Sequence, residues 1–304
     1  MDLKTVLIEK ADAYHRLGLQ QTRAAIRGAI AGRDKRCPPV AEVLELEIDG
    51  AVGPLAGRLY RPLGAQDGGP ALIFIHGGGF VIGDLDTNDA FCRRLAAASK
   101  VTVISANYRL APEAKFPAQF DDALAATRWV IANAGALGVC DHGLALCGDS
   151  AGAYLAIAVT ARLNAERPGA VGSQILVYPL MHIDDAIWST TVFQNSRVVG
   201  RAAVAYIRSQ LADGEINAPS LLDQDLPKAP PTLIVLGGPM DPVSPDAKLY
   251  AQKIAAQGVK VVMREYPLLP HGWANLTHVS SIARNAVTET AELAGALIRG
   301  DAVD

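Results

Sequence analysis

The chain has 304 residues, of which 50% are hydrophobic and 19% are charged, and its formal net charge is -3. This composition is sufficient for one large core and excludes a chain that is mostly disordered. The small net charge gives no electrostatic reason to expect nucleic acid or an anionic membrane as a partner.

The N-terminal sequence and the cysteines predict a cytoplasmic protein without a metal site. Charges interrupt the stretch MDLKTVLIEKADAYHRLGL, so it lacks the apolar centre of a secretion signal. No apolar run approaches the roughly 20 residues that span a bilayer. Cys37, Cys92, Cys140 and Cys147 are too few for a disulfide scaffold and lack paired metal-ligand spacing, although their even number leaves one bridge open.

Apolar residues recur at helical spacing over residues 2–32, and two alternating stretches, EVLELEIDG and PLAGRLYRP, then predict strands with one exposed face. Solid apolar runs follow, as expected for strands buried on both faces: ALIFI, VTVISA, LALCGD, SQILV and TLIVL. Helix-compatible stretches lie between them, near 88–99, 119–134, 151–166 and 246–257. The alternation predicts a mostly parallel sheet with helices on both faces.

Two further segments complete the predicted fold. GVKVVMREYP indicates a last, more polar strand at a sheet edge, followed by a closing helix. An edge strand can pair across a homodimer, whereas its charges can equally protect it. Residues 182–226 are far longer than the usual connection of about 2–6 residues, which predicts an insertion that covers something.

The stretch LCGDSAGAYLA places Ser150 between small residues at the end of a buried strand. The pattern G-x-S-x-G at a strand-to-helix turn is typical of a nucleophile elbow, in which the serine hydroxyl stands clear of the sheet. Gly148 and Gly152 then prevent collisions where the strand meets the helix. An ordinary strand–turn–helix connection is the alternative.

A serine nucleophile needs donors for the negative charge that develops on the substrate oxygen. HGGGF, residues 76–80, follows the strongest buried strand, and its glycines leave backbone N–H groups unobstructed. The N–H of Ala151 is the natural further donor. A flexible turn is the alternative for the glycines.

The serine also needs a base and an acid, which follow the nucleophile in the order acid, then histidine. Asp241 follows the strand TLIVL, and His271 follows the last strand. His271 would accept the Ser150 proton while Asp241 holds the imidazole tautomer. Asp246 and His278 are the local alternatives, and His76 is expected to fix the glycine loop.

These motifs occur together in one known family. Five stretches resemble, in the same order, motifs of the hormone-sensitive lipase-like α/β-hydrolases, the bacterial family IV carboxylesterases. These stretches are FIHGGGFVIGD, NYRLAPEAKFPAQFDDALAATRWV, LCGDSAGAYLA, DPVSPDAKLYAQKIAAQGVKV and YPLLPHGW. The resemblance runs from about Glu42 to the C-terminus.

The resemblance implies an α/β-hydrolase sheet of about eight strands, the second antiparallel, beneath a helical cap. The cap would comprise residues 1–41 and 182–226, and the core 42–181 and 227–304. By this resemblance, the catalytic triad is Ser150, Asp241 and His271. The oxyanion donors are Gly78, Gly79 and Ala151, and Gly77 shapes their loop. Members hydrolyse short to medium acyl esters without a metal or organic cofactor.

Several positions depart from the family pattern. Tyr154 stands one turn into the elbow helix, where it narrows the acyl pocket or packs in the core. Trp273 stands where the family has a smaller aromatic residue. The candidates for substrate contacts are Phe80, Tyr154 and Trp273. The loop GGPMDPVSPDA differs from the family's and could aim Asp241 differently. Asn88 stands where many relatives have histidine.

The leading hypothesis is therefore a serine carboxylesterase acting on small-molecule esters through an acyl-enzyme on Ser150. An amidase, lactonase or xenobiotic deacetylase would use the same triad. A non-catalytic small-molecule receptor is the alternative from another class, since plant gibberellin receptors resemble the family but lack the histidine base that His271 matches here.

Overall fold

The computed structural model describes residues 18–183, 201–214, 216, 218, 220–239 and 241–303. The helical spacing predicted before residue 18 and the part of the insertion at 184–200 lie outside the described residues. The predicted division into core and cap stays a prediction.

One sheet of eight strands runs through the molecule in the order β1-β2-β4-β3-β5-β6-β7-β8. The strands are β1 (Glu42–Asp49), β2 (Pro54–Arg61), β3 (Ala71–Ile75), β4 (Thr102–Ala106), β5 (Leu144–Asp149), β6 (Val171–Val177), β7 (Thr232–Leu236) and β8 (Val261–Glu265). β2 is antiparallel to both of its neighbours, and all other pairs are parallel. The predicted mostly parallel sheet is confirmed, with β1 and β8 at its edges.

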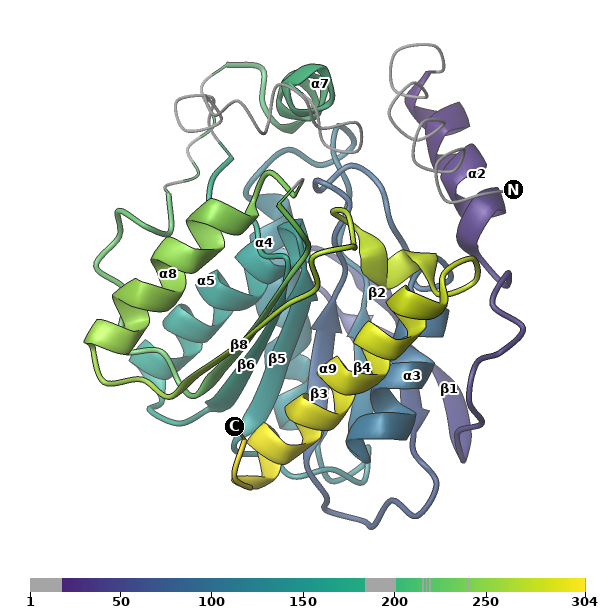
Figure 1. Cartoon of the computed structure of the whole chain (residues 1–304), viewed down its shortest axis with the longest axis vertical. Helices are drawn as coiled ribbons and strands as arrows, with labels where there is room; N and C mark the ends of the chain where they lie inside the picture. The colour runs from purple at the N-terminus through teal and green to yellow at the C-terminus, as the bar shows by residue number, and fades with distance from the viewer. Residues whose placement is uncertain are drawn as a thin grey trace.

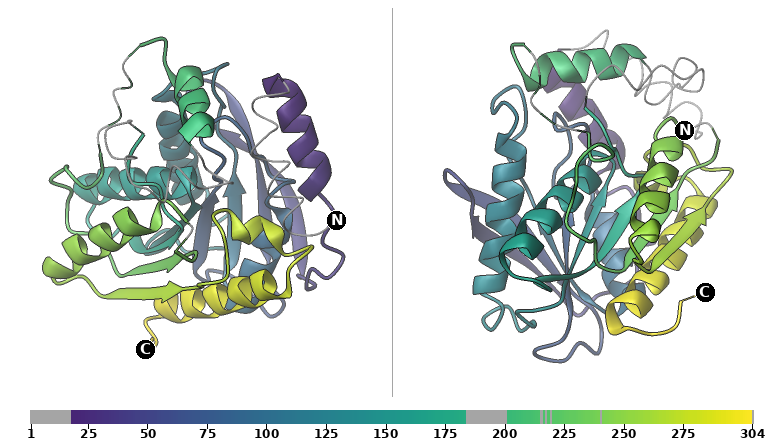
Figure 2. Two further views of the ribbon diagram at one scale, coloured as in Figure 1. Left: turned by 45° about the horizontal axis from the view of Figure 1, so that its top comes forward. Right: turned by 90° about the vertical axis from the view of Figure 1, so that its left-hand side faces the viewer.

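Helices cover both faces of this sheet (Figure 1). Their bounds are α2 (Leu19–Ile30), α3 (Asp89–Ser99), α4 (Ala118–Ala132), α5 (Ala151–Glu166), α7 (Arg201–Leu211), α8 (Ser244–Ala256) and α9 (Ser281–Arg299), with a 3₁₀ turn, η1, at Trp273–Leu276. α3 and α9 pack side by side on one face, and α4, α5 and α8 lie on the other (Figures 1 and 2).

The central strands contain the predicted apolar runs because helices bury both faces of the sheet. In β3 all five residues are buried. Because successive side chains of a strand point to opposite faces, Ile73 and Ile75 join the core beneath α4, α5 and α8, while Leu72 and Phe74 join the core beneath α3 and α9. β8 lies at the edge and accordingly carries more polar, partly exposed residues.

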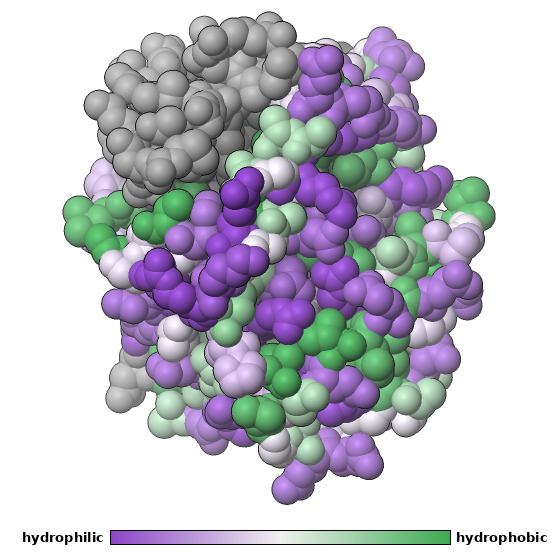
Figure 3. Space-filling model, turned by 90° about the vertical axis from the view of Figure 1, so that its right-hand side faces the viewer, coloured by the Kyte–Doolittle hydropathy of each residue, from purple (hydrophilic) through white to green (hydrophobic). Residues whose placement is uncertain are grey.

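The parallel strands bring their carboxyl ends to one edge of the sheet, where the loops after β3, β5, β7 and β8 meet. α2 and α7 lie beyond this edge, apart from the two helical layers (Figure 2). The face that carries α2 and β1 is mostly hydrophilic, with smaller hydrophobic areas between the polar residues (Figure 3). Among the described residues, no helix combines the length and apolar character that crossing a membrane requires.

Candidate active site

Ser150 lies on the turn between β5 and α5, and its backbone has φ 52° and ψ -116°. A positive φ is unfavourable for a residue with a side chain, so the turn is strained. Its glycines are required by close packing. A Cβ on Gly148 would lie 2.3 Å from the carbonyl carbon of Gly152, and a Cβ on Gly152 would lie 2.0 Å from the carbonyl oxygen of Ile75.

The structure brings Ser150, His271 and Asp241 together in one chain of hydrogen bonds. Oγ of Ser150 is 2.9 Å from Nε2 of His271, and Nδ1 of His271 is 2.9 Å from Oδ1 of Asp241. Asp241 is fully buried and His271 nearly so. Because Nδ1 faces a carboxylate, it carries the imidazole proton, and Nε2 is left to accept the Ser150 proton.

The local alternatives for the acid and the base are placed elsewhere. Asp246 lies on α8, and its Oδ2 is 3.5 Å from Nε2 of His182 rather than beside His271. The loop before Asp241 does not turn this residue away from His271, despite its departure from the family pattern. His278 follows η1, whereas the hydrogen bond to Ser150 comes from His271.

The glycine loop after β3 lies against the same serine. Gly78 and Gly79 have φ values of 105° and 61°, which glycine tolerates and other residues rarely adopt. A Cβ on Gly78 would lie 2.2 Å from the carbonyl oxygen of Ile82. Among the described residues, the N–H groups of Gly78, Gly79 and Ala151 donate no hydrogen bond. They are therefore free to bind an oxyanion.

His76 fixes the position of this glycine loop through its contacts with Gly77 and Tyr108. It is fully buried, its Nδ1–H donates to the carbonyl oxygen of Gly77 at 2.8 Å, and its ring stacks on that of Tyr108 at 4.3 Å. The Tyr108 hydroxyl donates to the carbonyl oxygen of His76 at 2.9 Å. Burial lowers the pKa of His76, so the ring stays neutral.

Asp149, which the sequence analysis did not single out, fixes the other side of the loop. Its Oδ1 accepts the N–H of Gly77 at 2.6 Å, and its Oδ2 accepts the Tyr178 hydroxyl at 3.2 Å. Burial and the neighbouring Asp149 carboxylate raise the pKa of Tyr178, so its hydroxyl remains a donor. A charged residue at the end of a fully buried strand is the sequence signal for this role.

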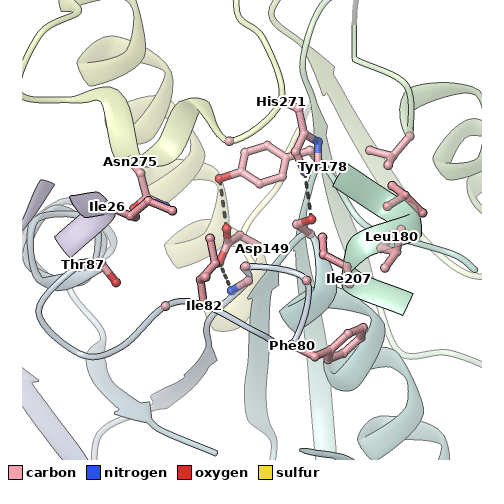
Figure 4. A pocket seen from close by; sticks show the side chains of 18 of the residues that line it. Ile26, Phe80, Ile82, Thr87, Asp149, Tyr178, Leu180, Ile207, His271 and Asn275 are labelled. Carbon is pink, nitrogen blue, oxygen red and sulfur yellow. Dashed lines mark hydrogen bonds between the residues drawn. The ribbon is translucent and has the colours of Figure 1, made fainter. Parts of the chain in front are cut away.

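A cavity of about 150 Å³ opens over these groups (Figure 4). A cavity of this volume suits a small substrate. Aliphatic side chains from both covering helices line it, Ile26 and Ile30 from α2 and Val204 and Ile207 from α7.

Of the three candidates for substrate contacts, only Phe80 lines this cavity. Tyr154 is buried in the core and packs edge-on against Phe80 and Phe116, at 6.1 and 6.5 Å between ring centroids. Trp273 is completely buried on the other face of the sheet, against Tyr178 and Tyr266. The expectation that Trp273 contacts substrate is corrected accordingly, because its ring packs in the core on the other face of the sheet. Of the two places expected for Tyr154, it occupies the core.

The described residues contain no cluster of three or more His, Cys, Asp or Glu side chains that could hold a metal ion. All four cysteines are free thiols.

The fold and this geometry agree with comparisons to known proteins. A model of the alpha/beta hydrolase fold family matches residues 72–275, which include the triad, the glycine loop and Asp149 but not Ile26 and Ile30 of the cavity wall. The chain belongs to the α/β-hydrolases. Within them, the resemblance to the hormone-sensitive lipase-like carboxylesterases is confirmed.

Individual relatives of this hydrolase are named as esterases. Esterase LipI of Mycobacterium tuberculosis is 33% identical over 292 residues, covering 92% of this chain and 91% of the relative. Ethyl acetate hydrolase of Pseudomonas putida is 31% identical and covers 81% of this chain and 79% of its own. The solved structure of an esterase from Pyrobaculum calidifontis superimposes with a TM-score of 0.83 at 31% identity, covering 94% of each chain.

Proposed function

We propose that the protein is a serine carboxylesterase that hydrolyses short- to medium-chain acyl esters through an acyl-enzyme on Ser150. One observation carries the proposal: the hydrogen-bonded chain from Ser150 through His271 to Asp241 borders the cavity beside the oxyanion-loop N–H groups, which donate to no described residue. Relatives named as esterases and an ethyl acetate hydrolase support an ester substrate.

In the acylation step, Oγ of Ser150 attacks the ester carbonyl carbon while Nε2 of His271 takes its proton. The N–H groups of Gly78, Gly79 and Ala151 stabilise the negative charge on the carbonyl oxygen. When the bond to the alcohol oxygen breaks, His271 returns the proton to that oxygen, and the alcohol leaves.

In the deacylation step, His271 takes a proton from water, whose oxygen attacks the acyl carbon. The bond to Oγ of Ser150 breaks, the serine regains its proton from His271, and the carboxylic acid leaves. Asp241 stabilises the imidazolium that forms in both steps. This cycle requires no group beyond the chain and water.

The first test is a p-nitrophenyl ester series from acetyl to palmitoyl. We expect the highest rate between butyryl and octanoyl, because the cavity is small and largely aliphatic. Ser150→Ala should abolish turnover, and His271→Ala should lower kcat by about 10³-fold or more, because triad members act as a unit. Retained activity in Ser150→Ala would contradict the assigned nucleophile.

Matched ester and anilide substrates separate the esterase from an amidase that uses the same residues. Faster turnover of the anilide would contradict the proposed ester preference. Stoichiometric ligand binding without turnover would instead indicate a receptor.

We also propose a cytoplasmic location and a homodimer that pairs through the edge strand β8. The four free thiols support the location, since reduced cysteines persist in the cytoplasm. The place of β8 at the sheet edge and the 42% exposure of Met263 support the dimer. No nucleic acid, membrane or cofactor takes part in the proposed activity.

A further inference from the structure

The cavity over Ser150 has two chemically different walls (Figure 4). Phe80, Leu180 and Ile207 lie on one side of the catalytic groups, and these three are apolar, whereas His182 and Arg208 add polar groups to the cavity lining. Thr87 and Asn275 lie on the other side together with Ile26. Asn88, which follows Thr87 in the chain, also lines the cavity. The two walls therefore favour different parts of a substrate.

The orientation of the Asn88 amide is determined by its neighbours. Its Nδ2 donates to the carbonyl oxygen of Asp84 at 3.1 Å and to Oγ1 of Thr87 at 3.2 Å. A flipped amide would place two acceptor oxygens, Oδ1 and the Asp84 carbonyl, against each other. Oδ1 of Asn88 has no hydrogen-bond partner among the described residues, although the residue is only 3% exposed.

Asn275 supplies a second amide to this wall. It lies in η1 and is partly buried, and its side chain makes no hydrogen bond with any described residue. Because its side chain contributes to no local network, its amide can both donate to and accept from a bound molecule. An apolar substrate would cover two amides without replacing their hydrogen bonds, which is unfavourable.

We propose that Asn88 and Asn275 form a hydrogen-bonding subsite for a hydroxyl group on the alcohol part of the ester. A hydroxyl both donates and accepts, so it can donate to Oδ1 of Asn88 or pair with the amide of Asn275. This assignment rests on the proposed esterase function.

The position of Asn275 in the chain assigns the subsite to the alcohol rather than to the acyl group. His271, Gly272 and Asn275 all border the cavity, and the N–H of Asn275 donates to the carbonyl oxygen of Gly272 at 3.2 Å, so they belong to one turn. His271 must reach the leaving oxygen to protonate it. The alcohol is therefore the part of the ester that this turn contacts, and the acyl chain takes the aliphatic wall.

Three isosteric esters test the subsite. Propyl butyrate is the reference, 2-hydroxyethyl butyrate replaces the terminal methyl of the alcohol by a hydroxyl, and propyl 3-hydroxypropanoate makes the same replacement on the acyl side. For each enzyme, kcat/KM for a hydroxylated ester is divided by kcat/KM for propyl butyrate. Comparing this ratio between variants removes the intrinsic reactivity of the esters.

In Asn275→Leu, we expect the ratio for 2-hydroxyethyl butyrate to fall by about three- to tenfold, as for the loss of one neutral hydrogen bond. The ratio for propyl 3-hydroxypropanoate should stay within about twofold. Asn275→Ala, which only removes atoms, should give the same result and replaces the leucine variant if that fails to fold. Ile207→Val, on the aliphatic wall, is the matched control and should leave the ratio for 2-hydroxyethyl butyrate unchanged.

The possible outcomes test the proposed subsite and the proposed esterase function separately. A loss confined to propyl 3-hydroxypropanoate would overturn the assignment to the alcohol part, and unchanged ratios for both esters would overturn the subsite itself. Failure of the wild-type protein to hydrolyse propyl butyrate, when its circular dichroism shows it to be folded, would contradict the proposed function instead.

Discussion

The strained backbone at Ser150 is held by hydrogen bonds from the neighbouring strand β6 and the segment that follows it. The N–H of Ser150 donates to the carbonyl oxygen of Val177 at 2.9 Å, and the N–H of Leu180 donates to the carbonyl oxygen of Ser150 at 3.1 Å. Both bonds involve only backbone atoms. Ser150→Ala should therefore keep the native turn, and its thermal unfolding provides the control for its loss of activity.

At the same scale, Asp149 positions the oxyanion donors through Gly77 without touching the reacting atoms. Asp149→Ala should lower kcat by about tenfold or more, because loss of one oxyanion donor alone costs about 10²–10³ in kcat and a loosened loop misplaces them. Asp149→Asn keeps an acceptor for the Gly77 N–H and should retain most of the activity.

Steady-state kinetics on p-nitrophenyl butyrate separates this role from a purely structural one. A positioning role predicts a lower kcat in Asp149→Ala with a similar KM, and rescue by asparagine. An equal loss in both variants, or full activity in Asp149→Ala, would contradict the role.

At the scale of elements, α2 is attached to the core by arginines that reach loops at the carboxyl edge of the sheet. Arg23 donates to the carbonyl oxygens of Val81 and Ala111 and pairs with both carboxylate oxygens of Glu113. Arg27 pairs with Asp84 in the segment just before Thr87. α2 thereby becomes part of the cavity wall through Ile26 and Ile30.

The stability that the ion pair between Arg23 of α2 and Glu113 contributes should depend on pH. The hydrogen bond from Arg23 lowers the pKa of Glu113 to about 2 from its ordinary value of 4.5. Because the folded-state pKa is the lower one, the stabilisation is complete above pH 4.5 and is lost as the pH falls towards about 2. The Glu113 side chain is 51% exposed, so solvent screening limits the contribution to about 1 kcal/mol or less.

Urea unfolding of the wild type and of Glu113→Gln measures the free energy that this ion pair contributes at each pH. The glutamine variant should be less stable by up to about 1 kcal/mol at pH 7, and the difference should shrink at pH 4. Glu47→Gln, which removes an exposed carboxylate on β1 that pairs with no described residue, controls for general charge effects. A difference that grows towards acid would contradict the assigned direction.

At the scale of the whole molecule, β8 determines how the sheet can extend. Among the described strands it pairs with β7 alone and lies at one end of the sheet. Met263 on β8 and Leu249 on α8 are 42% and 52% exposed. A second copy could continue the sheet across this edge, although Lys260 and Arg264 place charges at or beside β8 that oppose such pairing.

Light scattering coupled to size-exclusion chromatography checks the proposed dimer. We expect twice the chain mass of 32.0 kDa for the wild type and the monomer mass for Met263→Lys, because each copy would bring another cation to the shared edge. Met263 does not line the cavity, so hydrolysis by the variant serves as its folding control. A monomeric wild type would contradict the proposal.

Much of this architecture was predictable from local sequence. All eight strands lie in the predicted apolar or alternating stretches, and the five helices predicted between and after them end within a few residues of the expected positions. These patterns are local, because burial on one or two faces dictates which neighbouring residues are apolar. The small residues around Ser150 are likewise a local requirement of one turn.

Only the tertiary structure decided which side chains meet. The pairing of Asp241 rather than Asp246 with His271, the hydrogen bond from Gly77 to Asp149 and the wall formed by Asn88 and Asn275 all join segments far apart in the sequence. The structure likewise decided between the two places open to Tyr154 and put Trp273 in the core rather than beside the substrate. Sequence spacing specifies the element on which a side chain lies, whereas the packing of neighbouring elements determines whether that side chain faces the core or the cavity.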